Sequence, residues 1–379
     1  MKVRIGLYDT TMNYRRYQDE MDAALHEVLE HGDFEMGDAV RQFEREFAAY
    51  CGVQFGIATT SGTMALHLAL RALGLGPGDE VITAANTDVG TVLGIEHTGA
   101  TVRLADIEEA TFNIDPKAVE ACITPLTRAI VSVHMYGLPA DMDSLSAVAR
   151  RHDLVLVEDA ALAAGASYKG RKAGNLGDAA IFSTAAGKVL GGLGSGGIIV
   201  TNREEAARLA NSLRHYGRDD TPYRTERAPG TQPGVTVRFG YNARLDTLQA
   251  AALRVRLLHL DEELAHRRTI ARIYDERLGR GALTLPEVPA ESEHAYRTYV
   301  IRLPNRDRVH RRLLELGIET GLHYTPPIHL HPYWKHQGYR EGQFPVAERV
   351  SGDLLCLPCH PSLTEEQAHE IAGHILTAL

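Results

Sequence analysis

Short apolar runs alternate with helical stretches along the first half of the chain, and this alternation restricts the possible folds more than any other feature. Strands that alternate with helices are typical of a largely parallel sheet with helices on both faces. The chain is therefore predicted to have an α/β fold with a mostly parallel, seven-stranded sheet flanked by helices. The seven runs are residues 55–58, 80–83, 101–104, 129–133, 154–157, 179–182 and 197–200.

The pattern changes near residue 260, which predicts a second, smaller domain. Apolar residues at helical spacing predict helices over 17–31 and 38–50, one long helix over 244–279, and later helices over 308–316 and 365–379. A strand over 299–303 is predicted before the helix 308–316, and an extended segment over 318–324 is predicted after it. We therefore expect a large α/β domain over residues 1–259 and a small α+β domain over 260–379. The polar, Gly/Pro-rich segment 217–236 is predicted to be a long surface loop.

The composition excludes several classes of partner. The 379 residues carry a formal net charge of −9 and no basic stripe, so nucleic acid is not expected as a partner. No apolar run reaches the roughly 18 residues that a membrane span needs. The first residues lack the apolar region of a signal peptide. Four cysteines do not make a disulfide framework, so a cytoplasmic protein is expected.

Cys356 and Cys359 have the spacing of half a zinc site or of a redox pair. A zinc site would need a second pair at suitable spacing, which Cys51 and Cys122 do not provide. No metal is expected, and apolar packing is the favoured role of these cysteines.

Lys188 follows the apolar run 179–184 and precedes the glycine-rich segment 191–197, while Asp159 ends the buried run 154–159. Alone, they would be a solvated loop lysine and a carboxylate that caps the next helix. An amine at the mouth of a sheet, with a carboxylate at the end of a nearby strand, suits pyridoxal 5'-phosphate (PLP). This cofactor needs an amine for its Schiff base and an anion beside its pyridine nitrogen.

Residues 59–63, Thr-Thr-Ser-Gly-Thr, lie between a predicted strand and a predicted helix over 64–73. Free N–H groups at a helix N-terminus attract phosphate, and a plain serine N-cap is the alternative. Gly192, Gly194 and Gly197 match a dinucleotide motif, but they precede a strand instead of opening a helix, which disfavours an NAD-dependent dehydrogenase. We expect these glycines to let the backbone pass close to the cofactor.

In this order, the motifs resemble those of the DegT/StrS-type sugar aminotransferases, a family of enzymes with the PLP-dependent transferase fold type I. The resemblance runs nearly end to end, and it is the order and spacing of the motifs that make it specific. The matching segments are 32–37, 43–47, 61–63, 76–81, 133–143, 158–161, 168–171, 176–178, 182–188, 240–246, 248–251, 323–324 and 357–362.

The resemblance implies roles for the residues that bind the cofactor. Lys188 would carry PLP as a Schiff base and move the proton, and Asp159 would pair with the pyridinium nitrogen. Gly62, Thr63 and Ser183 would hold the phosphate.

The resemblance also implies residues beyond the cofactor site. Asn242 would reach the phosphate of the neighbouring subunit's cofactor, which implies a homodimer with shared active sites. His323 and Tyr324 lie where the family contacts the sugar nucleotide.

Two positions depart from the family pattern. The family usually has an aromatic residue over one face of PLP where this chain has Asp88. It usually has Gln or His three residues after the aspartate, where this chain has Leu162. We expect both residues to contact the substrate, with Asp88 bonded to a donor on it. The alternative is that Asp88 turns away and bonds a local backbone N–H.

The sequence thus predicts a PLP-dependent aminotransferase that moves an amino group from an amino acid, with L-glutamate favoured, to a keto group. The acceptor by resemblance is a nucleotide-linked deoxysugar, with 3-keto slightly favoured over 4-keto, in secondary-metabolite (including antibiotic) or cell-surface sugar biosynthesis. A keto-cyclitol of aminoglycoside biosynthesis is the nearest alternative. A PLP-dependent sugar dehydratase is disfavoured because such enzymes carry His at the position of Lys188. A non-catalytic, PLP-binding regulatory protein is the alternative from another class.

Overall fold

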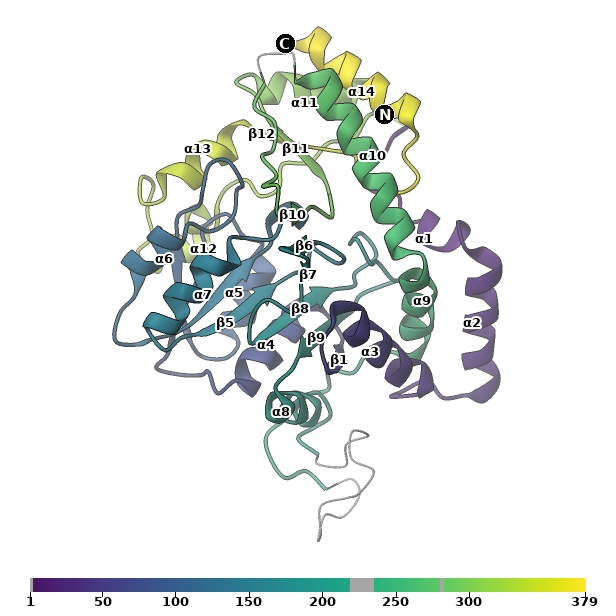
Figure 1. Cartoon of the computed structure of the whole chain (residues 1–379), viewed down its shortest axis with the longest axis vertical. Coiled ribbons are helices and arrows are strands. Elements are labelled where there is room, and N and C mark those ends of the chain that lie inside the picture. Colours follow the sequence, from purple (N-terminus) through teal and green to yellow (C-terminus); the bar gives the residue numbers. More distant parts are fainter. Residues whose placement is uncertain (1–2, 219–234, 280–282) are drawn as a thin grey trace.

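A central seven-stranded sheet organises the computed structural model, which describes residues 3–218, 235–279 and 283–379 (Figure 1). Every predicted run became one strand of this sheet. The strands are β1 (Phe55–Thr59), β2 (Glu80–Ala84), β3 (Thr101–Ala105), β4 (Thr127–Val133), β5 (Val155–Asp159), β8 (Ala179–Ser183) and β9 (Gly197–Thr201).

The sheet order is β1-β9-β8-β5-β4-β2-β3, so β5 is the middle strand. The pairs from β3 to β8 are parallel, whereas β9 runs antiparallel to both β8 and β1. The carboxyl ends of all strands except β9 therefore meet at one edge of the sheet, where ligands bind in folds of this kind.

Both faces of the sheet are buried. Successive side chains of a strand point to opposite faces. Accordingly Ile181 of β8 belongs to one apolar cluster, while its neighbours Ala180 and Phe182 belong to another. The first cluster is covered by helices such as α4 and α8, and the second by α3 and α9. This arrangement accounts for strands that read as continuous apolar runs.

The helices that surround the sheet begin and end as follows. They are α1 (Met12–Arg15), α2 (Gln18–His31), α3 (Asp38–Cys51), α4 (Gly62–Ala72), α5 (Val89–Glu96), α6 (Pro116–Cys122), α7 (Met142–Arg151), α8 (Glu204–Arg214), α9 (Thr247–Leu258) and α10 (Leu260–Leu278), with the short helix η1 (Met135–Gly137).

The prediction of one long helix over 244–279 was wrong, because the chain turns at His259 between α9 and α10. The two helices have different partners: α9 packs against α2 and α3, whereas α10 packs against the closing helix α14. The His259 ring stacks on Tyr17 with a centroid distance of 4.0 Å, and its Nε2 lies 3.0 Å from Glu20. Apolar periodicity alone cannot show a change of packing partner.

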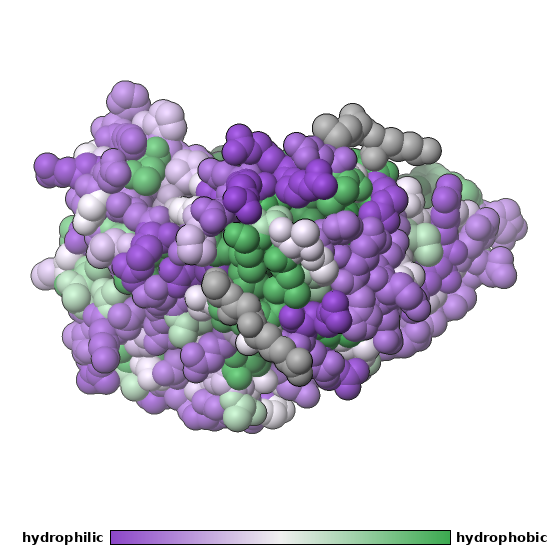
Figure 2. Space-filling model, turned by 90° about the horizontal axis from the view of Figure 1, so that it is seen from above, coloured by the Kyte–Doolittle hydropathy of each residue, from purple (hydrophilic) through white to green (hydrophobic). Residues whose placement is uncertain are grey.

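The C-terminal part contains a two-stranded antiparallel sheet and several helices. Its elements are β10 (Ser292–Glu293), β11 (Tyr299–Arg302), α11 (Arg306–Glu315), η2 (Ile328–Leu330), α12 (Pro332–Lys335), α13 (Pro345–Asp353), β12 (Leu354–Leu357) and α14 (Glu365–Ala378). Strand β10 pairs with the hairpin of β6 (Ser167–Tyr168) and β7 (Arg171–Lys172). The end of the molecule that carries α14 is mostly hydrophilic, with an apolar band between polar areas (Figure 2).

The apolar cores do not follow the predicted domain boundary at residue 260 throughout. A third cluster joins α10, β11, β12 and α14. However, Ile328, Trp334 and Phe344 belong to the cluster of the central sheet, and Ile5 from the N-terminus belongs to the third. The boundary at residue 260 stays a prediction.

Most of the loop predicted over 217–236 lies outside the described residues. Within the described part, no helix has the length and apolarity to cross a membrane.

Candidate active site

A cavity of about 180 Å³ opens at the edge of the sheet where the carboxyl ends of the parallel strands meet. Eight of the ten residues predicted for the site line it, although they come from segments far apart in the sequence. They are Gly62, Thr63, Asp88, Asp159, Leu162, Ser183, Lys188 and Tyr324. Asn242 and His323 are not among the residues that line it.

The N-terminus of α4 forms one wall of this cavity. Ser61 is the N-cap, and its side chain accepts a 3.1 Å hydrogen bond from the amide of Met64. The amides of Gly62 and Thr63 make no hydrogen bond within the described part of the chain, as expected for the first turn of a helix. A Cβ on Gly62 would lie 2.8 Å from Cβ of Ser183, so only glycine leaves room here. Free amides, a helix dipole and a nearby hydroxyl form a cradle for an anion.

Asp159 ends the middle strand and is only 4% exposed. Its Oδ2 accepts a 2.7 Å hydrogen bond from Thr91, and its Oδ1 accepts one of 3.1 Å from the amide of Ala161. Burial raises the pKa of Asp159, while these bonds and the charge of Lys188 act in the opposite direction. A cationic N–H placed against the carboxylate would also oppose the effect of burial, because it lowers the pKa of Asp159 and favours the ionised form.

Lys188 lies in the turn after β8, with its side chain in the cavity. Its amine has no hydrogen bond or ion pair among the described residues. Burial, assisted by the charge of Arg297, lowers the pKa of Lys188 to about 8, against the opposing effect of Asp88 and Asp159. About a tenth of the amine is therefore neutral at pH 7, far more than for an ordinary lysine, and the neutral form is the one that acts as a nucleophile or accepts a proton.

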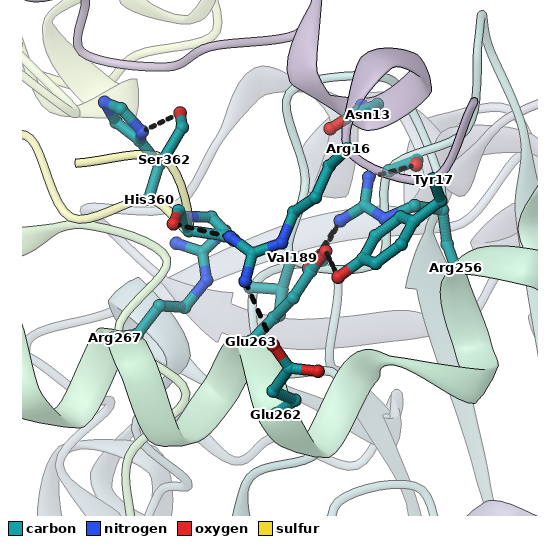
Figure 3. Close-up of polar contacts among 12 residues, drawn as sticks. Asn13, Arg16, Tyr17, Val189, Arg256, Glu262, Glu263, Arg267, His360 and Ser362 are labelled. Carbon is teal, nitrogen blue, oxygen red and sulfur yellow. Dashed lines mark hydrogen bonds and ion pairs between the residues drawn. The ribbon is translucent and has the colours of Figure 1, made fainter. Parts of the chain in front are cut away.

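Side chains from distant helices hold the turn that carries Lys188 (Figure 3). Asn13 donates hydrogen bonds of 2.7 and 3.2 Å to the carbonyls of Ala186 and Gly192. Arg256 of α9 donates to the carbonyl of Gly191 at 3.0 Å. The backbone on both sides of Lys188 is thus fixed by groups outside the turn.

Arg256 is itself fixed by a buried ion pair. Its Nη2 lies 2.6 Å from Oε2 of Glu263, and the other oxygen of Glu263 accepts a 3.1 Å hydrogen bond from Tyr17. Figure 3 shows Glu263 between Arg256 and Tyr17. The side chains of Arg256 and Glu263 are 3% and 2% exposed. This network links α2, α9 and α10 to the Lys188 turn.

A second buried pair lies directly behind Asp159. Glu158 accepts hydrogen bonds from the amides of Gly174, Leu176 and Gly177 at 2.7–3.0 Å. It also contacts Nε2 of His134 at 2.9 Å. Because Nδ1 of His134 accepts from a backbone amide at 3.3 Å, Nε2 carries the proton and donates it to Glu158. These bonds fix the end of β5.

Asp88 and Leu162, the two departures from the family pattern, both line the cavity. One oxygen of Asp88 accepts a 2.7 Å hydrogen bond from the amide of Gly90, so Asp88 is the N-cap of α5. The local backbone bond, considered as an alternative from the sequence, is therefore present. It occupies Oδ1 only, and a contact of Asp88 with the substrate stays a prediction.

The two predicted residues outside the cavity have different surroundings. Asn242 is exposed, and its Oδ1 accepts a 3.1 Å hydrogen bond from Arg244. His323 lies beside Tyr324, with Nδ1 3.3 Å from the hydroxyl of Tyr8. Burial lowers the pKa of His323 to about 4 and raises the pKa of Tyr8 to about 12, so both are uncharged at neutral pH.

The expectation that the glycine-rich segment passes close to the cofactor stays a prediction, and the structure shows which protein groups these glycines approach. A Cβ on Gly192 or Gly194 would lie 2.9–3.0 Å from the side-chain amide of Gln249, and a Cβ on Gly197 would overlap the main chain of Ser61. These glycines admit α9 and the start of α4, and none of them lines the cavity.

Sequence reasoning missed several residues around the cavity, among them Thr91, Tyr8 and Arg297. Thr91 could have been suspected from its place in the first turn of a helix after Asp88. Tyr8 and Arg297 lie in segments without a motif, and only the tertiary fold brings them near Lys188.

The cysteines considered for zinc are buried, with their pKa values raised to about 12 by burial. Within residues 3–218, 235–279 and 283–379, no group of His, Cys, Asp and Glu has the arrangement of a metal site.

The donor set of the cavity fits PLP. A buried amine, a buried carboxylate and an anion cradle with no room for a side chain on Gly62 face one space. These match the aldehyde, the pyridine nitrogen and the phosphate of the cofactor. Lys188, Asp159, Gly62, Thr63 and Ser183 are the residues that would hold it.

The comparisons with known proteins agree with this site. The sequence pattern of the DegT/DnrJ/EryC1/StrS aminotransferase family matches residues 15–376. A "pleiotropic regulatory protein" of Geobacillus stearothermophilus is 40% identical over 98% of each chain. A dTDP-3-amino-3,4,6-trideoxy-alpha-D-glucose transaminase of Streptomyces venezuelae is 40% identical over 96% of this chain and 93% of its own. The crystal structure of S. venezuelae DesV in complex with a ketimine intermediate superposes with a TM-score of 0.93, at 38% identity, covering 100% of this chain and 98% of that one.

Fold and site together define a PLP-dependent aminotransferase. The chain belongs to the DegT/DnrJ/EryC1/StrS aminotransferase family. The predictions of the fold class, of the cofactor and of an enzyme are thereby confirmed.

Proposed function

We propose that the protein transfers an amino group from an amino acid, L-glutamate being favoured, to the keto group of a nucleotide-linked deoxysugar. The observation that carries this proposal is the convergence of Lys188, Asp159 and the anion cradle of α4 on one cavity. The name of the S. venezuelae relative, a transaminase that forms a 3-amino sugar, favours a 3-keto acceptor.

The residues of the chain have distinct tasks in this reaction. When bound, PLP accepts the electrons of the substrate bond that breaks. Lys188 accepts and returns the proton at its Nζ, for which its lowered pKa suits it. Asp159, held by Thr91 and the Ala161 amide, keeps a negative charge at the end of β5. Apolar Leu162 lines the cavity beside them.

We further propose a cytoplasmic homodimer in which each active site takes Asn242 from the partner chain. Asn242 is exposed and lies outside the cavity of its own chain, and Phe239, three residues before it, is 77% exposed. A large apolar side chain in that position supports a covered surface. The pathway we propose is amino sugar biosynthesis, either for a secondary metabolite such as an antibiotic or for a cell-surface sugar.

Mixing the Lys188→Ala and Asn242→Ala variants, both of which we expect to have impaired activity, tests the shared site. In a dimer of a Lys188→Ala chain and an Asn242→Ala chain, one site has both residues intact if sites are shared. Activity should then return on mixing, to about half of the parent per dimer in the hybrid fraction. Without shared sites, mixing restores nothing.

A substrate panel tests the reaction itself. The holoenzyme is incubated with L-glutamate and, in turn, 3-keto and 4-keto nucleotide deoxysugars and a keto-cyclitol, and the amino product is detected by mass spectrometry. We expect amination of a 3-keto nucleotide sugar. Exclusive amination of the cyclitol, or of no ketone at all, would reject the proposed acceptor class.

A further inference from the structure

Arg297 is a buried cation whose side chain has no hydrogen-bond or ion-pair partner among the residues that the structure describes. It precedes β11 and is 8% exposed. Its Nε and Nη1 are buried without any hydrogen bond. The guanidinium carbon lies 3.5 Å from the centre of the Tyr8 ring, so the ring covers one face of the guanidinium.

A buried guanidinium without hydrogen-bond acceptors is unfavourable unless a ligand provides them. A buried donor without an acceptor destabilises a protein by about 1–3 kcal/mol, and by more when it is charged. The groups that act on the Arg297 charge are Tyr8, Tyr324 and Cys356, and burial raises the pKa of each of them. None of these three groups is an anion at neutral pH. The carboxylate of Asp88 acts on His323 and Tyr324, as Arg297 does, but it is not among the groups that act on the Arg297 charge.

The guanidinium lies beside the turn that carries the reactive lysine. A Cβ on Gly187, the residue before Lys188, would be 3.4 Å from Nη2 of Arg297, which is an ordinary contact distance. Arg297 also acts on the charge states of Lys188 and His323, lowering the pKa of both. Tyr8 connects these groups, because its ring stacks with Arg297 and its hydroxyl contacts His323.

We propose that Arg297 binds a carboxylate of the substrate whose amino or keto carbon is presented to Lys188. This inference rests on the proposed function and adds the residue that recognises the acid group. The planar guanidinium suits a carboxylate because it can donate two parallel hydrogen bonds. Stacking on Tyr8 fixes the plane of the guanidinium before the substrate arrives.

Two sources can supply this carboxylate: the amino-acid donor, or an acceptor that is itself a keto acid or a keto-uronate. Both place an acid group beside the carbon that reacts. Carboxylate binding is therefore measured first, and each half-reaction is then measured separately.

The binding experiment titrates holoenzyme with succinate, a dicarboxylate without an amino group, in a calorimeter. Arg297→Met should weaken binding by about 10- to 100-fold, the effect of losing a charge-assisted hydrogen-bonded pair. Arg297→Lys should retain part of the affinity, because it keeps the charge and loses the planar fork. Arg312→Met is the control, since it removes the same charge from an exposed pair on α11.

Thermal unfolding of ligand-free holoenzyme separates this role from a structural one. Removing an unpaired buried charge should leave the melting temperature unchanged or raise it. A structural Arg297 would instead lower the melting temperature when replaced by Met. Equal succinate affinity of the parent and Arg297→Met would overturn the proposal, whatever the folding result.

The half-reactions identify the source. If the donor supplies the carboxylate, Arg297→Met raises the KM for L-glutamate in the first half-reaction and leaves the acceptor KM unchanged. If the acceptor supplies it, the reverse holds. Unchanged KM values for both substrates would again contradict the assignment. The glutamate half-reaction needs no keto-sugar, so a wrong acceptor class would not affect this arm.

Discussion

The hydroxyl of Thr91 donates a 2.7 Å hydrogen bond to Oδ2 of Asp159 and accepts one of 2.7 Å from the hydroxyl of Thr87. All three residues are buried. Because burial raises the pKa of Asp159, this donated bond is one of the few interactions that favour its ionised form. Thr91 is thus a positioning residue for the carboxylate.

Thr91→Val should lower the rate of the half-reaction with L-glutamate by about 10- to 100-fold, because it removes a hydrogen bond to a charged group. Thr91→Ser keeps the hydroxyl and should stay within a few-fold of the parent. Stopped-flow absorbance of the bound cofactor measures both rates. Equal rates for the Val and Ser variants would show that the bond does not support catalysis.

The lowered pKa of Lys188 predicts a pH-dependent stability of the cofactor-free protein. The pKa is about 8 in the folded chain and 10.5 in the unfolded chain, so the unfolded state binds more protons between these values. Stability from this group is therefore lost as the pH falls from 10.5 to 8, by on the order of 3 kcal/mol. Lys188→Met should unfold at a higher urea concentration than the parent at pH 7, and the difference should shrink toward pH 10.5. A difference that does not depend on pH would contradict the shift.

Arg256→Met should destabilise the protein strongly, because it leaves the carboxylate of Glu263 buried without its cation. The expected loss is about 3–5 kcal/mol in the free energy of unfolding. The neighbouring pair of Arg254 with Glu46 is much more exposed, so Arg254→Met is a matched control with an expected loss of at most about 1 kcal/mol. Urea denaturation compares the two variants. Similar losses in the free energy of unfolding would mean that the buried ion pair does not stabilise the protein more than the exposed one.

Asp88 has both a structural contact and a place in the cavity, and a substitution can separate them. Asp88→Ser keeps an oxygen that can cap α5 and removes the carboxylate. If Asp88 contacts the acceptor, this variant should raise the acceptor KM by about tenfold or more and leave the glutamate half-reaction unchanged. Steady-state kinetics with the preferred acceptor measures this. An unchanged acceptor KM would restrict Asp88 to capping.

The sheet could be predicted because each strand is a short apolar run with both faces buried, from β1 to β9. The positions of Asp159 and Ser183 followed because each is the last residue of such a strand, and Lys188 followed because it lies in the turn after β8. The turn at His259 could not be predicted, because α9 and α10 have the same apolar spacing and differ only in the helices that they contact.

The residues that support the site were not predictable for a similar reason. Asn13, Arg256 and Arg297 approach Lys188 from separate parts of the chain, and none belongs to a motif with a chemical meaning. Their role depends on contacts between residues far apart in the sequence, and such contacts cannot be derived from the sequence pattern.

Borohydride reduction followed by peptide mapping shows which lysine carries PLP. The reagent fixes PLP to the lysine that carries it, so the holoenzyme is reduced, digested and analysed by mass spectrometry. We expect the added mass of the reduced cofactor on the peptide that contains Lys188, and none in a Lys188→Ala variant treated in the same way. The added mass on another lysine, or its persistence in Lys188→Ala, would contradict this expectation.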